Sequence, residues 1–555
     1  FNMSFSTNKH QQLSFDDNFN GLSARTKKFI LNSWAGGFAD IIFPAINEEP
    51  FAVLYSTNAF SRPNTPVNIV IAALLLKEMC GLTDDELLLN ILTDVKYQYA
   101  LHTTSYKEQP ISDRTLSRFR ERLYHYELET GVDLLKEEMM SIADQMVNFM
   151  NINPSIKRMD SVMIASSCKK MSRLEIVYTC ISNLIKIIQA DGREKVLTPR
   201  LSLYLEDDHK NNTLYRSKTE DLELNLENAL TDAASLARLG AGAYKETEEF
   251  KMLTRALKEQ AQFNEDGSVT PKNKKEIRTD SLQNPSDPDA TFRRKAGECH
   301  KGYVGNFVET MGGDGAIITQ FSYEQNIHSD SAFCKEVVDE LSVQEEPVML
   351  IADGAYGGED NIQRAKENNI ELITTTLLGK DPDVILGDFV INEEEHKVHY
   401  CPQWRAPVKT TYNPNQGSYR MLFLKEHCNQ CKHRKACRVK NQKKYAVVTI
   451  SPKTVARAKY VARLSTEELK RFTRMRNAVE GIPSVLRRRY HVDQIPVRGF
   501  VRSKIWYTLK IGAINAKRAV AKAFFRLFFV KQNHFDSLNK IKNQMIIRKL
   551  RMRIA

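Results

Sequence analysis

The stretch VMLIADGAYGGEDN, residues 348–361, constrains the fold more than any other part of this chain. Its first five residues are apolar, which is typical of a strand buried inside a sheet. The strand ends abruptly in an acid, Asp353, and several of the residues that follow are glycines. Glycines at such a place let a bulky substrate backbone approach the acid without side chains in the way. The stretch therefore predicts a buried strand that carries a functional carboxylate at its tip.

Extended and helical patterns alternate on both sides of this stretch. Residues 156–166, IKRMDSVMIAS, are typical of a strand with Asp160 in its middle. A lone acid inside a strand costs free energy unless a partner or a metal compensates for its lost hydration. Further strands are expected in YVGNFVETMGG, GAIITQFSYE and IELITTTL, with helices in SDSAFCKEVVDELS and near residues 359–368. This order predicts a mixed α/β sheet with helices on its faces, interrupted by a helical insertion at about residues 168–290.

Three acids converge on one edge of this sheet if its first and fourth strands pair. Asp160 and Asp353 then meet, and a helix packed on the sheet delivers Glu480 from the basic segment RNAVEG. Three converging carboxylates repel one another unless cations bind, and two Mg²⁺ or Mn²⁺ ions would balance them. Taken singly, each acid also has a structural interpretation. Asp160 would be a turn residue, Asp353 a helix cap and Glu480 a surface ion-pair partner.

The N-terminal domain is predicted to be helical. An early proline and a final glycine bound one helix in TPVNIVIAALLLKEMCGL, and a threonine before three acids opens the next in TDDELLLNILTDVKYQYAL. The segment PISDRTLSRFRERLYHYE then predicts an arginine-rich helix with an inward stripe of Leu116, Phe119 and Leu123. Arg114 and Arg118 project from its other faces. This succession indicates a DNA-binding helix-turn-helix unit, and the alternative is an ordinary surface helix of a bundle.

Positive charge is concentrated at the C-terminal end. Residues 451–555 hold 26 Lys and Arg against 5 Asp and Glu, whereas the whole chain has a net charge of +12. This concentration indicates a surface that faces a polyanion, and a solvated, solubilising face is the alternative. No apolar stretch approaches the roughly 18 to 20 residues that span a bilayer, and the N-terminus lacks the pattern of a secretory signal. We therefore predict a cytoplasmic protein with no membrane partner.

Four of the nine cysteines lie in one window. They are Cys401, Cys428, Cys431 and Cys437, with the spacing C-x26-C-x2-C-x5-C. In a cytoplasmic chain such clustering favours one structural Zn²⁺, because four thiolates complete a tetrahedral site. Reversible disulfides and free thiols are the alternatives.

Three segments resemble the catalytic blocks of the DDE transposases of bacterial insertion sequences. These segments are MDSVMIAS, ADGAYGG and RNAVEGIPSVLRRRY…PVRGFVRSKIWYTLKIGAINAKR. FSRPNTPVNIVIAALLLKEMCGLTDDELL…PISDRTLSRFRERL resembles the helical DNA-binding region that begins many such enzymes. The cysteine window, YCPQW…CNQCKHRKAC, has counterparts in the insertion-sequence family eleven eighty-two. The resemblance runs from about residue 50 to about residue 520.

The resemblance implies a ribonuclease H-like core in which Asp160, Asp353 and Glu480 bind two Mg²⁺ or Mn²⁺ ions. It implies hydrolysis of a phosphodiester at the element's end, followed by attack of the freed 3′-hydroxyl on target DNA. Related enzymes place an aromatic residue, an arginine and a lysine around the glutamate. Here Arg476 stands four residues before it, and Arg487 occupies the position of the lysine. Thr473 replaces the aromatic residue, so the sequence does not distinguish hydrolytic excision from a hairpin intermediate.

We expect a set of basic residues to contact DNA phosphates, with binding that weakens steeply with salt. This set is Arg114, Arg118, Arg476, Arg487, Arg498, Arg502 and Lys504. The DNA partners implied are the terminal repeats of the element and the target. The resemblance also implies a homodimer or larger assembly on paired ends, associated with the bacterial nucleoid when it acts.

Three other functions fit parts of the pattern. A metal-dependent nuclease without strand transfer would use the same three acids. A catalytically silent, transposase-derived DNA-binding protein would keep the fold without the reaction. A zinc-dependent nucleic-acid binder would leave the three acid-bearing segments unexplained.

The predicted organisation has five parts, since 555 residues exceed one ordinary core. They are a helical DNA-binding domain (1–150), the first part of the catalytic core (151–392), a Cys-rich insert (393–445), the last part of the core (446–530) and a basic tail (531–555).

Overall fold

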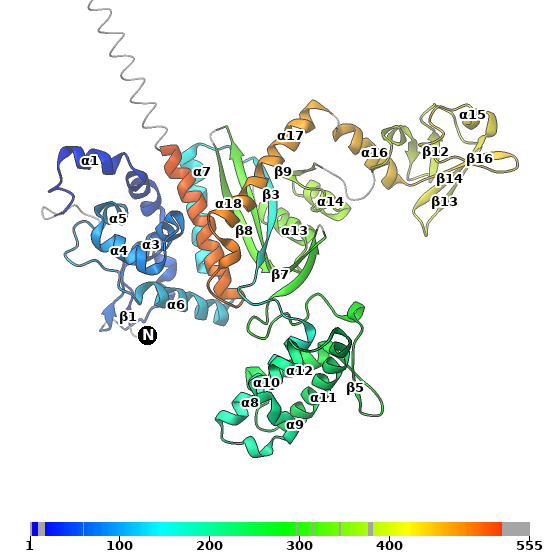
Figure 1. The fold of residues 1–555 in the computed structure, drawn as a ribbon. Coiled ribbons are helices and arrows are strands. Elements are labelled where there is room, and N and C mark those ends of the chain that lie inside the picture. The colour runs from blue at the N-terminus through cyan, green and yellow to red at the C-terminus, as the bar shows by residue number, and fades with distance from the viewer. Residues whose placement is uncertain are drawn as a thin grey trace, which may run out of the picture. The chain divides into compact units, whose positions relative to one another are not determined.

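The computed structural model describes residues 3–8, 17–58, 60–295, 297–313, 315–342, 346–375, 381–464 and 466–523. The predicted basic tail, residues 531–555, lies outside these described residues. The chain divides into two compact units, and Figure 1 labels their elements. The first unit comprises residues 1–154, 161–329 and 482–555, and the second comprises residues 155–160 and 330–481.

The first unit begins with helices whose ends follow from the sequence. Helix α3 (Val67–Cys80) stops at Gly81, which has the left-handed φ of 72° that glycine adopts without a steric penalty. Helix α4 (Asp84–Thr93) starts with a capping box between Thr83 and Glu86. The remaining elements of this region are β1 (Met3–Ser4), α1 (Ala24–Leu31), α2 (Trp34–Gly37), β2 (Arg62–Pro63), α5 (Val95–Ala100), α6 (Thr115–Thr130) and α7 (Leu134–Met150).

Helix α6 is the arginine-rich helix predicted from the sequence. Its stripe of Leu116, Phe119 and Leu123 is buried, as expected. Residues 101–114 separate α5 from α6, whereas a helix-turn-helix unit has a turn of about three to four residues. The helical character of this region is therefore confirmed, and the helix-turn-helix assignment stays a prediction.

In the main sheet of the first unit, β7 (Glu298–Gly312) pairs antiparallel with β6 (Thr291–Lys295) and with β8 (Gly315–Gln325). In the strand order β7 lies between β3 (Ile156–Ala165) and β6, and β8 pairs with the later residues of β7. Residues 500–523 form a long helix that packs closely on β7. A Cβ atom at Gly305 would lie 2.6 Å from the ring of Tyr507, so this approach requires a glycine.

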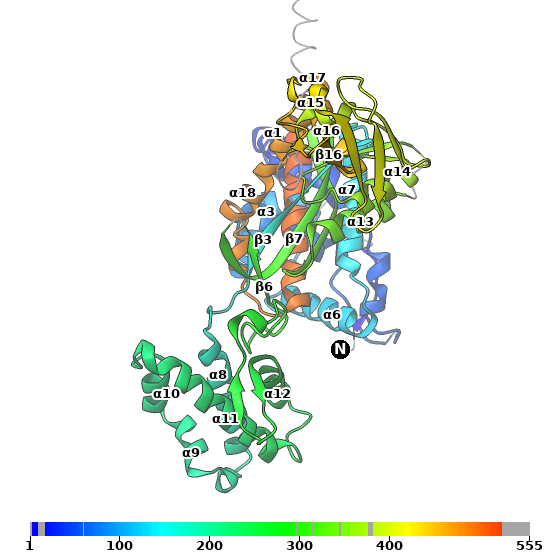
Figure 2. The same cartoon turned by 90° about the vertical axis from the view of Figure 1, so that its right-hand side faces the viewer.

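The predicted helical insertion is also present in the first unit. Three of its helices share a core of residues such as Leu184, Leu230 and Leu253, and Figures 1 and 2 show them side by side. Among the residues that the structure describes, no helix is long and apolar enough to cross a membrane. The elements of the insertion are α8 (Arg173–Ala190), α9 (Pro199–Ser202), α10 (Asp207–Leu214), α11 (Leu222–Gly240), α12 (Glu248–Gln260), β4 (Ala261–Phe263) and β5 (Val269–Pro271).

The second unit contains a parallel sheet of three strands in the order β10-β9-β3, to which β3 contributes its first residues. Phe472 from α17 packs against Ile351 and Ile373 of this sheet. The strand–helix–strand order predicted for residues 348–374 is confirmed. The elements are α13 (Asp330–Leu341), β9 (Val348–Ala352), α14 (Glu359–Glu367), β10 (Ile370–Thr374), α16 (Pro452–Leu464) and α17 (Glu467–Asn477).

The cysteine window of the second unit forms small antiparallel sheets. Tyr419, Met421, Phe423 and Val448 belong to a buried cluster beneath them. The cysteines lie outside the strands, on the connecting loops and on a short helix. The elements are β11 (Val390–Asn392), β12 (Lys397–Tyr400), β13 (Lys409–Asn413), β14 (Ser418–Leu424), α15 (Lys425–Asn429), β15 (Lys440–Asn441) and β16 (Tyr445–Ile450).

Candidate active site

The pairing of β3 with β9 brings two of the predicted acids together. The strands are parallel, and their last registered pair is Arg158 with Ile351. Two residues further along each strand, this register brings Asp160 level with Asp353. The condition set for the meeting of these two acids, that the first and fourth strands of the core pair, is therefore met.

The loop after β9 is held by its own hydrogen bonds. Asp353 Oδ1 accepts a bond of 2.6 Å from the Gly354 N–H, and its carbonyl accepts one of 3.1 Å from the Tyr356 N–H. A Cβ atom at Gly357 would lie 2.4 Å from the Thr374 Cγ2 atom. Glycine is thus required at residue 357 because the loop packs on β10. This corrects our attribution of that glycine to the approach of a substrate.

Glu480 lies at a break in its helix. Helix α17 ends at Asn477, a 3₁₀ turn η9 (Ala478–Glu480) follows, and α18 (Gly481–Arg488) begins after it. Pro483 explains the interruption, because proline donates no hydrogen bond and its ring clashes with the carbonyl four residues earlier. The sequence predicted one basic helix here, and the structure replaces it with two helices that meet at Glu480.

All three acids form ion pairs with Arg476. Its Nη2 atom lies 3.8 Å from Asp160 Oδ2 and 3.7 Å from Asp353 Oδ2, and its Nη1 atom pairs with Glu480 Oε1. The Arg476 side chain is 13% exposed, and its Nε–H is buried with no hydrogen-bond partner among the described residues. Neighbouring contacts fix α17, since Arg158 donates a bond of 2.6 Å to the Met475 carbonyl. The guanidinium of Arg476 thus forms ion pairs with all three acids that the sequence predicted to lie together.

The chemistry of this donor set fits a divalent cation. Carboxylate oxygens are the ligands that Mg²⁺ and Mn²⁺ prefer. Within the described parts of the chain, however, no three His, Cys, Asp or Glu side chains are arranged to hold a metal ion as they stand. The guanidinium of Arg476 lies among the acids and balances their charge. A metal could therefore enter only if Arg476 moved away.

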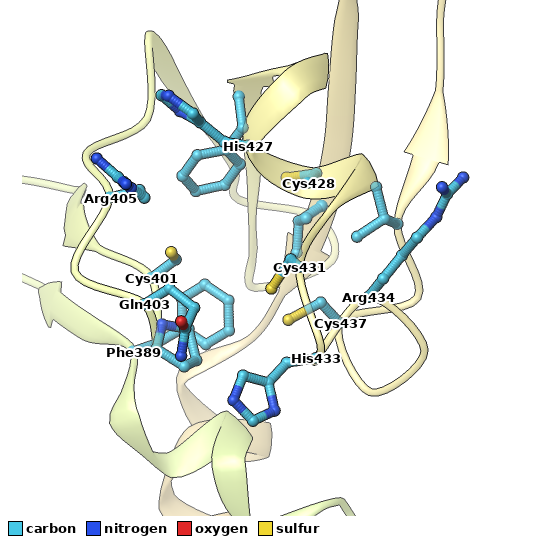
Figure 3. A pocket seen from close by; sticks show the side chains of 14 residues that line it. Phe389, Cys401, Gln403, Arg405, His427, Cys428, Cys431, His433, Arg434 and Cys437 are labelled. Atoms are coloured by element: carbon cyan, nitrogen blue, oxygen red, sulfur yellow. The ribbon is translucent and has the colours of Figure 1, made fainter.

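The four cysteines of the window line one cavity of about 30 Å³ (Figure 3). All four are free thiols. Burial, with the nearby Cys431, Cys401 and Cys428, raises the pKa of Cys437 to about 12. Burial, and next Cys401 and Cys431, also raises the pKa of Cys428. Each thiolate would repel the next, and a bound cation would offset that repulsion. The donors fit Zn²⁺ by their chemistry, although they are not arranged as a metal site.

The predicted DNA-contacting residues have different surroundings. Arg114, Arg118 and Arg498 are exposed. Arg487 donates a bond of 2.9 Å to the Met163 carbonyl and lies 3.2 Å from Asp493 Oδ2.

Two of these cations are bound to acids of the N-terminal helices. Arg502 pairs with both oxygens of Glu121, at 3.0 and 3.1 Å. Lys504 is 17% exposed, pairs with Glu127 and lies 3.3 Å from Asp133 Oδ2. We had expected Lys504 to contact DNA, and the structure instead uses its charge to neutralise two partly buried acids.

Sequence reasoning missed an acidic pair that positions the final helix. Asp287 Oδ1 accepts bonds from the Gly499 N–H at 3.2 Å and from the Tyr303 hydroxyl at 2.5 Å. Asp289 Oδ2 accepts one from the Phe500 N–H at 3.2 Å. These bonds satisfy N–H groups at the start of the helix, which have no partner within it. The two acids flanking Pro288 in SDPDAT were the available signal.

Two family models match the chain. The model described as Transposase DDE domain matches residues 400–520, and the one described as Transposase domain (DUF772) matches residues 31–122. Both matches support a DDE transposase of the insertion-sequence type. The first match includes Arg476, Glu480 and the cysteine window, and the second includes the helices from α2 to the first half of α6. No curated protein and no solved structure matches the chain.

Proposed function

We propose that this transposase cleaves the ends of its insertion sequence and joins them to target DNA by two-metal phosphoryl transfer. The observation that supports this proposal is the convergence of Asp160, Asp353 and Glu480 on Arg476. The acids come from two paired strands and from a break in a helix. Such convergence of distant carboxylates is costly unless it serves a cation. We further propose that the mixed sheet belongs to a ribonuclease H-like core.

Each side chain of the site has a proposed role. Asp160, Asp353 and Glu480 would hold two Mg²⁺ or Mn²⁺ ions. When bound, those ions would stabilise charge on the attacking and leaving oxygens of an in-line displacement. Arg476, once released from the acids, would grip a phosphate beside the scissile bond through its planar fork of donors. Arg487 would hold a second phosphate in the same way.

The N-terminal helices and the cysteine window would support this reaction. Arg114 and Arg118 would face the terminal DNA from α6, in a helix-turn-helix or related arrangement. The four cysteines would hold one structural Zn²⁺ and fix the loops of the insert, because four thiolates leave no open position for catalysis. The active form would be a homodimer or larger assembly that pairs the two ends of the element.

One observation favours a second candidate, a catalytically silent DNA-binding descendant of a transposase. Arg476 neutralises the three acids in the structure, as a permanent ion-pair network would. The two candidates differ in one property, because only the enzyme must release Arg476 when a divalent cation binds.

The experiment is strand cleavage and joining on a labelled duplex taken from the DNA that flanks this gene. Wild type is compared with Asp353→Asn in Mg²⁺, Mn²⁺ and EDTA. Asp339→Asn is the matched control, because Asp339 pairs with Arg364 on the surface of the same unit. We expect defined nicks and joined products with wild type and the control, and neither with Asp353→Asn or EDTA. Nicks without joined products would indicate a nuclease, and tight binding without nicks would indicate the silent descendant.

A further inference from the structure

The cysteine-rich insert separates its charges by segment. Residues 425–444 contain eight Lys and Arg but a single acid, Glu426. The turn between β11 and β12 instead carries three consecutive acids, Glu393 to Glu395. The basic segment includes α15, the loop with Cys431 and Cys437, and β15. A local excess of this size within twenty residues produces a positive field that the net charge of the chain does not reveal.

Seven of the eight cations of this segment are exposed and have no acidic partners among the described residues. Within the described residues, no ion pair joins any of them to a carboxylate, whereas Arg463 elsewhere in this unit pairs with Glu371 at 2.6 Å. Their charge is thus not used to hold the fold. We call this set the basic knuckle: Lys432, Arg434, Lys435, Arg438, Lys440, Lys443 and Lys444.

The backbone beneath the basic knuckle is fixed. The Arg434 N–H donates to the Cys431 carbonyl at 3.1 Å, and the Cys437 N–H donates to the His433 carbonyl at 3.0 Å. Arg438 has a left-handed φ of 47°, which turns the chain toward β15. Figure 3 shows the Arg434 guanidinium directed away from the cavity that the cysteines line. The loop therefore turns its thiols inward on a fixed backbone, and the same backbone carries the cations.

We propose that the basic knuckle binds the phosphate backbone of duplex DNA without regard to sequence. Duplex DNA carries one charge per about 1.7 Å of its axis, so a cluster of exposed cations complements its charge. Lysines predominate in the knuckle, and a flexible ammonium suits point contacts to phosphates rather than the reading of base edges. The ligand class rests on the proposed function, which makes DNA the partner. The basic knuckle would add phosphate contacts to those of the DNA-contacting residues predicted from the sequence.

The test is a salt series of duplex binding without added Mg²⁺, so that catalysis plays no part. The triple variant Lys432→Gln, Arg434→Gln, Lys435→Gln is compared with wild type on an element-end duplex and on an unrelated duplex. Each lost phosphate contact lowers the slope of log K against log salt by about 0.9. We expect the slope to fall by about two to three units and the affinity to drop about 10- to 100-fold on both duplexes.

A matched control removes the same charge elsewhere. The variant Lys186→Gln, Lys195→Gln, Arg238→Gln alters three exposed cations of the helical insertion, and we expect a slope close to that of wild type. Trp404 supplies a local signal, because it is 73% exposed and lies three residues after Cys401. The fluorescence of Trp404 is the part of the tryptophan emission that is lost in Trp404→Phe. We expect this part to change when DNA binds.

Three outcomes would overturn the inference. The first is an unchanged slope in the knuckle variant, and the second is an equal loss in the control, which would attribute the effect to net charge. The third is a loss confined to the element-end duplex, which would indicate reading of the sequence. A protein that binds through the knuckle but never cuts DNA would contradict the proposed function and leave this inference intact.

Discussion

The Nη2 atom of Arg476 lies 3.7 Å from Oδ2 of Asp353, an acid on a loop that strand β9 positions. The same guanidinium reaches Asp160 and Glu480. It therefore supplies the positive charge that three converging carboxylates require. A divalent cation would compete with Arg476 for the same oxygens.

Removing Arg476 should strengthen divalent-cation binding while weakening cleavage. Two unit charges about 4 Å apart interact by about 4 kcal/mol at an effective dielectric of 20, and solvent at the exposed Glu480 reduces this. We expect Arg476→Gln to bind Mn²⁺ about five- to tenfold more tightly by calorimetry. Arg476→Lys keeps the charge and should resemble wild type. Equal Mn²⁺ affinity in all three proteins would show that Arg476 does not compete with the metal.

Closing the break at Glu480 should impair cleavage without harming the fold. Pro483→Ala restores an N–H group and lets α17 and α18 approach one continuous helix. We expect unchanged or slightly higher thermal stability and at least a tenfold loss of cleavage, because Glu480 would shift relative to the aspartates. Ser484→Ala, at the next residue of α18, serves as the control. Full activity of Pro483→Ala would mean that the break has no role in placing Glu480.

Glu138 should make the first unit less stable as pH rises. Its side chain is buried and accepts a bond of 2.7 Å from the Asn47 N–H, and burial raises its pKa from 4.5 to about 7. The folded protein thus holds a proton that the unfolded chain releases between pH 4.5 and about 7. The free energy of unfolding should fall across this window by about 2–3 kcal/mol.

Denaturant unfolding at a series of pH values measures this contribution. Glu138→Gln cannot titrate and should lose that part of the pH dependence, whereas Glu137→Gln, which changes an exposed neighbour, should retain it. A Glu138→Gln profile parallel to that of wild type from pH 4.5 to 7 would rule out Glu138 as the titrating group.

The cysteine window should contain zinc when the protein is prepared without chelators. We expect about one Zn²⁺ per chain by elemental analysis, its loss in Cys437→Ser and its retention in Cys299→Ser, which alters an exposed cysteine. Since burial and neighbouring thiols raise the pKa of Cys437 to about 12, zinc uptake should release protons and tighten as pH rises. Full zinc occupancy in Cys437→Ser would exclude this cysteine as a ligand.

Local features of the fold were predictable because short segments encode them. Gly81 ends α3 and Thr83 begins α4, since a left-handed glycine and a capping box act within one helical turn. The apolar run before Asp353 identified β9 for the same reason. The pairing of β3 with β9 was only a condition at that level, and the structure supplies it.

Side-chain partners from distant segments could not be read from the sequence in this way. Lys504 lies in a basic stretch, but tertiary packing sets it beside Glu127 and Asp133. Likewise, the spacing of Arg476 and Glu480 indicated that they share a helix face, but not that both aspartates lie near the same guanidinium. Charge patterns locate cations, whereas the fold decides which of them remain available to DNA.

Mn²⁺ binding is the most direct test of a metal site shared by Asp160, Asp353 and Glu480. Calorimetry would compare wild type with Asp160→Asn, Asp353→Asn and Glu480→Gln, with Asp339→Asn as the control. A shared metal site should give up to two bound ions per chain in wild type and the control, and at least tenfold weaker binding in each of the other three variants. Binding that is the same in all five proteins would contradict a shared metal site formed by Asp160, Asp353 and Glu480.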